Sequence, residues 1–239
     1  KAFELLPLPV NLVIAGKKGW KYRTIFKKIK MSGKAKQIKY LNYVEEKDSL
    51  SQKPFEEGLR VIYGRASQYA PLVAEAFESH KVPAALGVYQ AMVESEYHDC
   101  PTNAHPNGPV GLFQFSRKTA ARYGLMPADY CDVRKQSDAA ARHMSDLISD
   151  FGSEKSSWTL ALLSFNIGAD GVRVYLREMR SRGVTERNYW TLLRDRKSVA
   201  PNAEELGLPY VPRFFAAAVI GESPAAFDLS TPPLTTLKQ

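Results

Sequence analysis

The chain has 239 residues, of which 44% are hydrophobic, and it contains fifteen glycines and fifteen prolines. This length suits one large domain, or one domain with an extension, and the composition excludes a collagen-like or wholly disordered chain. No run of eighteen or more apolar residues occurs, so we expect no membrane-spanning helix.

The net charge of +8 is concentrated at the N-terminus. Residues 1–44 hold eleven Lys and Arg and one acid, a net charge of +10, which leaves −2 for the other 195 residues. We interpret residues 1–56 as a basic N-terminal extension. Such a segment either binds an anionic wall polymer, an anionic lipid or nucleic acid, or is a solvated flank. Because the chain begins with Lys1 and not Met, we expect a processed or truncated product whose targeting signal is gone.

Helical periodicity dominates from residue 57 onward, and no alternating strand pattern of useful length occurs. We therefore expect a mainly α fold, with a core domain over 57–223 and an irregular tail over 224–239. Proline, serine and glycine punctuation predicts the individual helices. They are expected at 57–70, from Pro71, from Pro83 to about 95, at 116–123, 137–151, 158–165 and 170–181, and from Pro212 to about 220.

Glu94 is the first residue whose surroundings indicate chemistry. A helix from Pro83 places it in the last turn, where the negative end of the helix dipole disfavours ionisation. Burial beside Ala91, Met92 and Val93 disfavours ionisation further. Both effects raise the pKa of the carboxyl group, as a general acid working near neutral pH requires. The alternative for this run alone is a surface glutamate at a helix end.

The run Gly-Leu-Phe-Gln-Phe at 111–115 places a polar amide between aromatic rings. In a sugar-binding site, Phe113 and Phe115 would stack on the faces of sugar rings, and Gln114 would bond an N-acetyl group or a hydroxyl. The alternative is a core turn with one hydrogen-bonded glutamine.

Two further polar side chains are candidates for the same site. Asn166 follows an apolar helix and precedes Gly168, so it is either a site residue or an ordinary helix C-cap. Tyr210 follows Pro209 and is either a site residue or part of the packing.

Cys100 and Cys131 fit no metal-binding spacing. They either form one disulfide around the 111–115 motif, which requires an oxidising compartment, or are two reduced thiols.

Taken in order, these motifs resemble the lytic transglycosylase domain of the soluble-transglycosylase and goose-type lysozyme superfamily, in particular the membrane-bound lytic murein transglycosylase D type. The resemblance covers residues 75–222, and four ordered motifs are far more specific than any one. The motifs are Glu-Ser at 94–95, Gly-Leu-Phe-Gln-Phe at 111–115, Ala-Leu-Leu-Ser-Phe-Asn-Ile-Gly at 161–168 and Tyr-Val-Pro-Arg at 210–213.

The resemblance implies a lysozyme-like α-helical domain that cleaves the β-1,4 bond between N-acetylmuramic acid and N-acetylglucosamine in peptidoglycan. Glu94 would protonate the glycosidic oxygen and then, as a carboxylate, deprotonate the muramoyl 6-hydroxyl, which closes on C1 to give a 1,6-anhydro end. Ser95 and Gln114 would hold polar groups of the substrate. Asn166 and Tyr210 would line the site, with Tyr210 bonded to Glu94. No metal and no cofactor are implied.

The chain departs from the family pattern at three places. Phe165 replaces the usual tyrosine before the motif asparagine, and Phe113 stands where another aromatic or a methionine is usual. Glu96 and Asp99 add two acids after the Glu-Ser pair. We draw two hypotheses: Asp99 positions a water and makes the enzyme a hydrolytic lysozyme, or the two acids favour deacetylated glycan. The alternative for both is a solvated loop.

The partner expected is peptidoglycan, bound by a monomer that is periplasmic, outer-membrane-associated or secreted. An inactive wall-binding module, docked through its basic segment, is a competing interpretation. Nucleic acid is a third, supported only by the aromatic and basic residues near the N-terminus, and we do not expect it.

Overall fold

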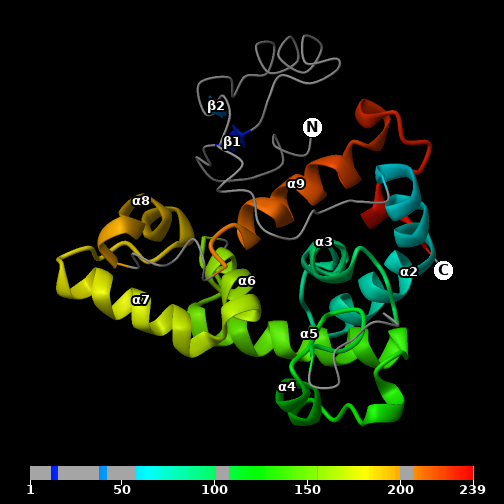
Figure 1. Cartoon of the computed structure of the whole chain (residues 1–239), viewed down its shortest axis with the longest axis horizontal. Coiled ribbons are helices and arrows are strands. Elements are labelled where there is room, and N and C mark those ends of the chain that lie inside the picture. The colour runs from blue at the N-terminus through cyan, green and yellow to red at the C-terminus, as the bar shows by residue number, and fades with distance from the viewer. Residues whose placement is uncertain are drawn as a thin grey trace. The chain divides into compact units, whose positions relative to one another are not determined.

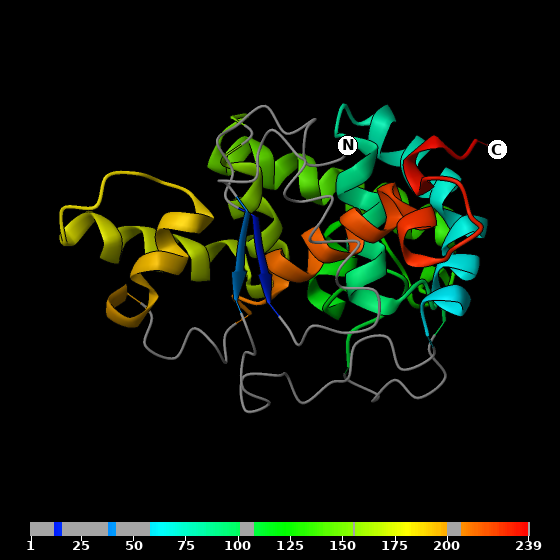
Figure 2. The same ribbon diagram turned by 90° about the horizontal axis from the view of Figure 1, so that it is seen from above.

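The computed structural model describes residues 12–15, 38–41, 58–100, 108–154, 156–199 and 207–238. The chain divides into two units, Lys1–Glu56 and Glu57–Gln239. In the first unit, β1 (Leu12–Ala15) pairs in parallel with β2 (Ile38–Leu41), as Figure 2 shows. The sequence predicted no strand because four-residue runs are too short to show a pattern. The rest of the predicted basic extension lies outside the described residues.

The described part of the second unit is helical, which confirms the mainly α fold predicted from the sequence (Figure 1). Its α-helices are α2 (Leu59–Ser79), α3 (Ala84–Ser95), α4 (Arg117–Arg122), α5 (Val133–Phe151), α6 (Trp158–Ile167), α7 (Ala169–Ser181), α8 (Tyr189–Val199) and α9 (Tyr210–Glu222). Its 3-10 helices are η3 (Pro127–Asp129), η4 (Pro224–Phe227) and η5 (Leu234–Thr236). No described helix is long and apolar enough to cross a membrane.

Local capping explains where several helices begin. Pro83 immediately precedes α3, as predicted, and the Ser116 hydroxyl accepts a hydrogen bond from the Thr119 backbone N–H at the start of α4. Helix α5 begins at Val133, four residues before the predicted start, because the Asp132 carboxylate caps it by accepting from the Lys135 N–H.

The prediction that Pro71 starts a new helix is wrong. Helix α2 runs through Pro71 without interruption. A proline inside a helix removes one backbone hydrogen bond and costs about 3 kcal/mol. The apolar face of α2 continues on both sides of the proline, with Ala66, Ala70 and Val73 all fully buried. Packing of that face against α3 and α5 therefore outweighs the local cost.

Helix α3 lies between α2 and α9, as Figure 1 shows, and this packing places the end of α3. Two glycines allow the close approach. Gly87 faces the ring of Phe77 on α2, and Gly221 of α9 faces the ring of Tyr89 on α3, so that a Cβ at either glycine would collide with the ring. Helix α5 packs against α2 and α6, and α6 packs against α7 and α9.

The structure differs from the sequence-based prediction in two segments. Helix α8 was missed because its sequence is mixed in charge, although Tyr189 and Leu192 are fully buried. The segment 224–239, expected to be irregular, contains η4 and η5, and η5 packs against α2, α3 and α9. Leu234 is fully buried there, and the Thr235 hydroxyl donates to Glu222 Oε1 at 2.8 Å.

Candidate active site

Glu94 lies in the last turn of α3, partly buried, and points toward the start of α9. The Tyr210 hydroxyl donates a hydrogen bond to Glu94 Oε1 at 2.7 Å, the contact that the resemblance implied. Burial raises the pKa of the Glu94 carboxyl group from 4.5 to about 7, against the opposing effects of the Tyr210 hydrogen bond and the Arg213 charge. Near neutral pH, both the acid and the carboxylate are therefore populated, as a group that gives and then takes a proton requires.

Tyr210 is the hydrogen-bond donor to this carboxyl group in the structure. Its side chain is 4% exposed, and burial, followed by the charge of Glu94, raises the pKa of its phenol well above the usual range. The phenol is consequently protonated at any pH at which Glu94 titrates, and its single proton is directed at Oε1.

Arg213 supplies positive charge to the same region from the next turn of α9. Its charge lowers the pKa of Glu94, while burial lowers the pKa of the guanidinium and Glu94 raises it again. Within the described residues, the Arg213 Nη2 atom is buried and has no hydrogen-bond partner. Arg213 thus acts on Glu94 through space, with part of its hydrogen-bonding capacity unused.

The 111–115 motif forms a tight turn that is tied to the end of α3. Val110 and Phe115 form an antiparallel bridge, and the Gln114 N–H donates to the Gly111 carbonyl at 3.1 Å. The Ser95 hydroxyl donates to the Leu112 carbonyl at 2.7 Å, so the residue next to Glu94 holds the turn in place.

Gln114 occupies an unusual position in that turn. Its φ of 48° lies in the left-handed region that non-glycine residues rarely adopt, and its side-chain Nε2 donates to the Gly111 carbonyl at 2.7 Å. Gly111 itself has φ 71°, and a Cβ there would collide with the Gln136 side chain beneath it. Strained backbone held by surrounding contacts is typical of functional positions.

The expectation that Phe113 and Phe115 stack on sugar rings is wrong. Phe113 is 0% exposed and Phe115 is 2% exposed, so neither ring can present a face to a ligand. Phe113 stacks on Phe77 at 6.0 Å between ring centroids, and Phe115 packs against Phe165 at 5.5 Å. The two rings support the turn from inside the core, because an aromatic pair gains more from burial than from facing water.

Asn166 is exposed in the last turn of α6, while Gly168 is the residue that caps this helix. Its side-chain oxygen lies against Gly207, where a Cβ would collide with it. Gly207, with φ 91°, immediately precedes the segment that leads into Tyr210 and α9. Asn166 is therefore a surface residue close to the chain that carries Tyr210.

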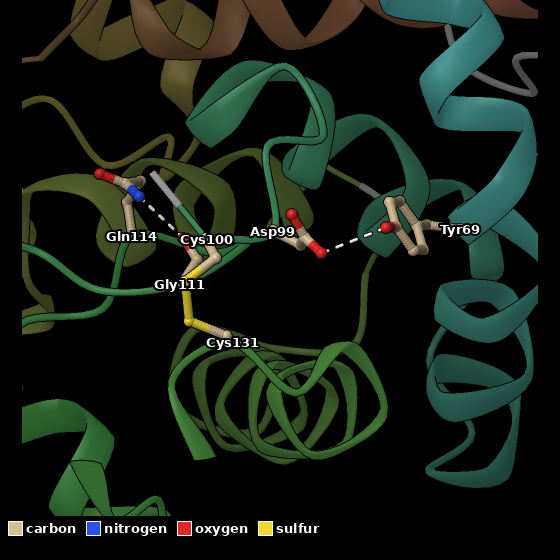
Figure 3. The surroundings of a disulfide bond; sticks show 6 residues. All are labelled: Tyr69, Asp99, Cys100, Gly111, Gln114 and Cys131. Atoms are coloured by element: carbon tan, nitrogen blue, oxygen red, sulfur yellow. Dashed lines mark hydrogen bonds between the residues drawn. A yellow bond between two sulfur atoms is a disulfide. The ribbon is translucent and has the colours of Figure 1, made fainter. Parts of the chain in front are cut away.

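The two extra acids lie after the end of α3. Glu96 is its C-cap, in the left-handed conformation, and its backbone carbonyl accepts two hydrogen bonds from the Arg65 guanidinium. The Tyr69 hydroxyl of α2 donates to Asp99 Oδ2 at 3.1 Å. Figure 3 shows Asp99 directed toward Tyr69 and not toward Gln114.

A disulfide joins Cys100 to Cys131, which are 31 positions apart in the sequence (Figure 3). The loop that it closes contains the 111–115 turn and α4. Of the two alternatives left open by the sequence, the structure contains the bridge. It fastens the chain that follows Glu94 to the start of α5.

Two polar residues beside Glu94 were not anticipated as members of this region. Gln90 lies one helical turn before Glu94 on α3 and is 0% exposed, and Arg213 is described above. A single amide in the otherwise apolar run Leu-Gly-Val-Tyr-Gln-Ala-Met-Val was a usable signal for Gln90. Among the described residues, no group of three or more His, Cys, Asp or Glu is arranged to hold a metal ion.

Comparison with known proteins gives one match. Residues 71–188 match the family model described as the transglycosylase SLT domain, which supports the lytic transglycosylase superfamily and the cleavage of glycosidic bonds in peptidoglycan. No curated protein matches the chain. The matched range contains Glu94, Ser95, Gln114 and Asn166, whereas Tyr210 and Arg213 lie beyond it.

Proposed function

We propose that the protein is a peptidoglycan lytic transglycosylase in which Glu94 is the only general acid and base. The observation that carries this proposal is the setting of Glu94: a partly buried carboxyl group with a pKa of about 7, bonded by Tyr210. The match to the transglycosylase SLT domain supplies the substrate class. The four ordered motifs support a membrane-bound lytic murein transglycosylase D type.

In the first step, the Glu94 acid would donate its proton to the oxygen of the β-1,4 bond between N-acetylmuramic acid and N-acetylglucosamine. The bond between C1 and that oxygen breaks, and the N-acetylglucosamine side leaves with a 4-hydroxyl. Positive charge develops at C1, and the Glu94 carboxylate remains beside it.

In the second step, the Glu94 carboxylate would take the proton of the muramoyl 6-hydroxyl, and O6 would form a bond to C1. The product is a 1,6-anhydro end, Glu94 is again protonated, and no water is consumed. One carboxyl group suffices because the sugar supplies the nucleophile that a second carboxylate or a water provides in other glycosidases.

The Tyr210 hydrogen bond assigns different roles to the two carboxyl oxygens. Because Tyr210 donates to Oε1, the proton of the acid form is best placed on Oε2, which is then the oxygen that faces the substrate. Gln114 and Asn166 would bind polar groups of the glycan, and Ser95 would act mainly by holding the 111–115 turn. Phe165, which replaces the usual tyrosine, would contribute an aromatic ring to this region but no hydroxyl group.

The hydrolytic alternative assigns a water to Asp99. This alternative has weaker support, because the hydrogen bond of the Asp99 carboxylate comes from Tyr69 on α2. The preference of Glu96 and Asp99 for deacetylated glycan also stays a hypothesis, and equal digestion rates of acetylated and deacetylated sacculi would contradict it.

Mass spectrometry of the products released from purified sacculi tests the proposal. We expect 1,6-anhydro ends from the wild type and no release from Glu94→Gln, which keeps the shape and removes the proton. Reducing ends in place of anhydro ends would indicate a lysozyme. Equal release by both proteins would rule out Glu94 as the acid, and binding without release by either would indicate a wall-binding module.

Further parts of the proposal concern where the protein acts and what the N-terminal unit does. A peptidoglycan substrate and the Cys100–Cys131 bridge favour a periplasmic, outer-membrane-associated or secreted location. We also propose that the protein acts as a monomer. The basic residues 1–44 would attach the domain to anionic wall polymer or lipid. Sedimentation with sacculi or anionic vesicles, with and without 1–56, distinguishes these partners.

A further inference from the structure

Gln90 is the most deeply buried polar side chain beside the proposed acid. It is 0% exposed, and neither its Nε2 nor its Oε1 atom has a hydrogen-bond partner among the described residues. A buried amide with unused donors and acceptors destabilises a fold, and such groups in native proteins commonly have a functional explanation.

The packing of α3 against α9 fixes the neighbours of Gln90. The Glu94 carboxyl group meets Tyr210, and the Tyr89 ring packs edge-on against Phe214 at 6.3 Å between centroids. The two helices thus run in opposite directions along each other. Gln90 and Glu94 are four residues apart on α3 and share one face of it, so Gln90 lies in the interface one turn along from the Tyr210 contact.

The amide of Gln90 is close enough to the Tyr210 hydroxyl to affect it. The nearby Gln90 amide lowers the pKa of the Tyr210 phenol, against the larger effects of burial and of the charge and hydrogen bond of Glu94. Within the described residues, the amide forms no hydrogen bond in this structure. The terminal torsion of a glutamine is soft, so rotation of the amide plane would direct its N–H toward the phenol oxygen.

We propose that Gln90 is a positioning residue that fixes the direction of the hydrogen bond between Tyr210 and Glu94. The inference rests on the proposed function of Glu94. The Gln90 N–H would occupy the acceptor side of the Tyr210 oxygen, so that the phenol keeps its only proton for Glu94 Oε1.

The direction of this bond matters because a protonated carboxyl group can reverse it. Without Gln90, the acid form of Glu94 is free to donate its own proton from Oε1 to the Tyr210 oxygen. That proton then points away from the glycosidic bond and is lost to catalysis. With the acceptor side of Tyr210 occupied, the proton stays on Oε2, the oxygen assigned above to the substrate.

Gln90 is not the only buried glutamine without partners, and the second one provides a control. Gln136 on α5 is also 0% exposed, and neither of its amide atoms has a hydrogen-bond partner in the described part of the chain, but it lies beneath Gly111. Tyr210 and Arg213, both on α9, are the titratable and charged groups that act on Glu94. Gln136 is thus a buried amide of the same kind without a role in the direction of the Tyr210 bond.

The test replaces Gln90 with methionine, which has a similar volume and no amide. Because the Gln90 amide has no hydrogen-bond partner among the described residues, its removal is expected to leave the melting temperature unchanged or raised. The rate of glycan release from sacculi should nevertheless fall roughly 10-fold, because the general acid is less often correctly oriented. The alkaline limb of the pH–rate profile should move up by about 0.5 pH unit, because a weaker Tyr210 bond stabilises the carboxylate less.

Two comparisons separate positioning from a merely structural role. In a Tyr210→Phe background, Gln90→Met should have no further effect on rate or profile, because its effect passes through the phenol. Gln136→Met should leave the midpoint of the profile unchanged, whatever it does to the melting temperature. If Gln90→Met does not fold, Gln90→Leu is measured in its place.

An unchanged rate and midpoint in Gln90→Met would overturn the inference while leaving the proposed function intact. A full 10-fold loss in the Tyr210→Phe background would also overturn it, since the effect would not pass through Tyr210. Failure of the proposed function itself is recognised separately, by a wild type that releases no glycan or a Glu94→Gln variant that releases as much as the wild type.

Discussion

Replacing Glu94 with glutamine should increase the stability of the protein in a pH-dependent manner. The pKa of Glu94 is raised from 4.5 to about 7 by burial, so the folded protein holds a proton on this residue where the unfolded chain has already lost it. Stability falls with rising pH wherever the folded state binds more protons. As the pH rises from 4.5 to about 7, Glu94 therefore lowers the free energy of unfolding progressively. Above the folded pKa, this destabilisation has reached its full size and no longer changes with pH.

The magnitude follows from the size of the shift. One pKa unit corresponds to about 1.4 kcal/mol, so the rise from 4.5 to about 7 amounts to about 3 kcal/mol. Glutamine matches the shape of the protonated acid and carries no charge. The gain from Glu94→Gln should consequently be small at about pH 5 and approach 2–3 kcal/mol at about pH 8.

Urea unfolding of both proteins at the two pH values measures this gain directly, because the free energy of unfolding extrapolates linearly with denaturant. The matched control is Glu78→Gln, at an exposed glutamate on α2. Losing an exposed charge should give the same small change at both pH values. Equal gains from Glu94→Gln at both pH values would refute the reasoning, because the carboxyl group would then not be held protonated by burial.

Three further outcomes are expected. Tyr210→Phe removes a donor to the Glu94 carboxylate, so the alkaline limb of the pH–rate profile should move up by about 1 unit. Arg213→Met removes a charge that lowers the pKa of Glu94, and should move the same limb upward by a smaller amount. Reducing the Cys100–Cys131 bridge should lower the free energy of unfolding by about 2–4 kcal/mol, measured by urea titration with and without reductant.

Helix positions were largely predictable because they depend on local signals. Pro83, Ser116 and Gly168 mark boundaries that the structure contains, since caps act within one turn of the residue that supplies them. Pro71 was misread because its local cost is outweighed by packing on both sides of it, and periodicity does not report what covers a helix face.

At the candidate site, the aromatic residues of the 111–115 motif also show that a sequence pattern does not reveal what packs against a side chain. The sequence places Phe113 and Phe115 on either side of Gln114, but the side to which each ring turns depends on Phe77 and Phe165, which are distant in sequence. Whether a ring faces water or the core is decided by these partners.

The sequence alone was enough to predict the fold class, the family resemblance and the candidate acid. Helical periodicity and each of the four motifs involve residues that are close together in the chain, and the order of the motifs can be read directly from the sequence. The family resemblance also implied the contact between Tyr210 and Glu94, which are 116 residues apart. Only the tertiary structure placed Gln90 and Arg213 beside them. The raised pKa of Glu94 results mainly from burial, which depends on how α3 and α9 pack. A hydrogen bond or a desolvated charge is a matter of a few ångströms, and such distances are set by packing that no local pattern encodes.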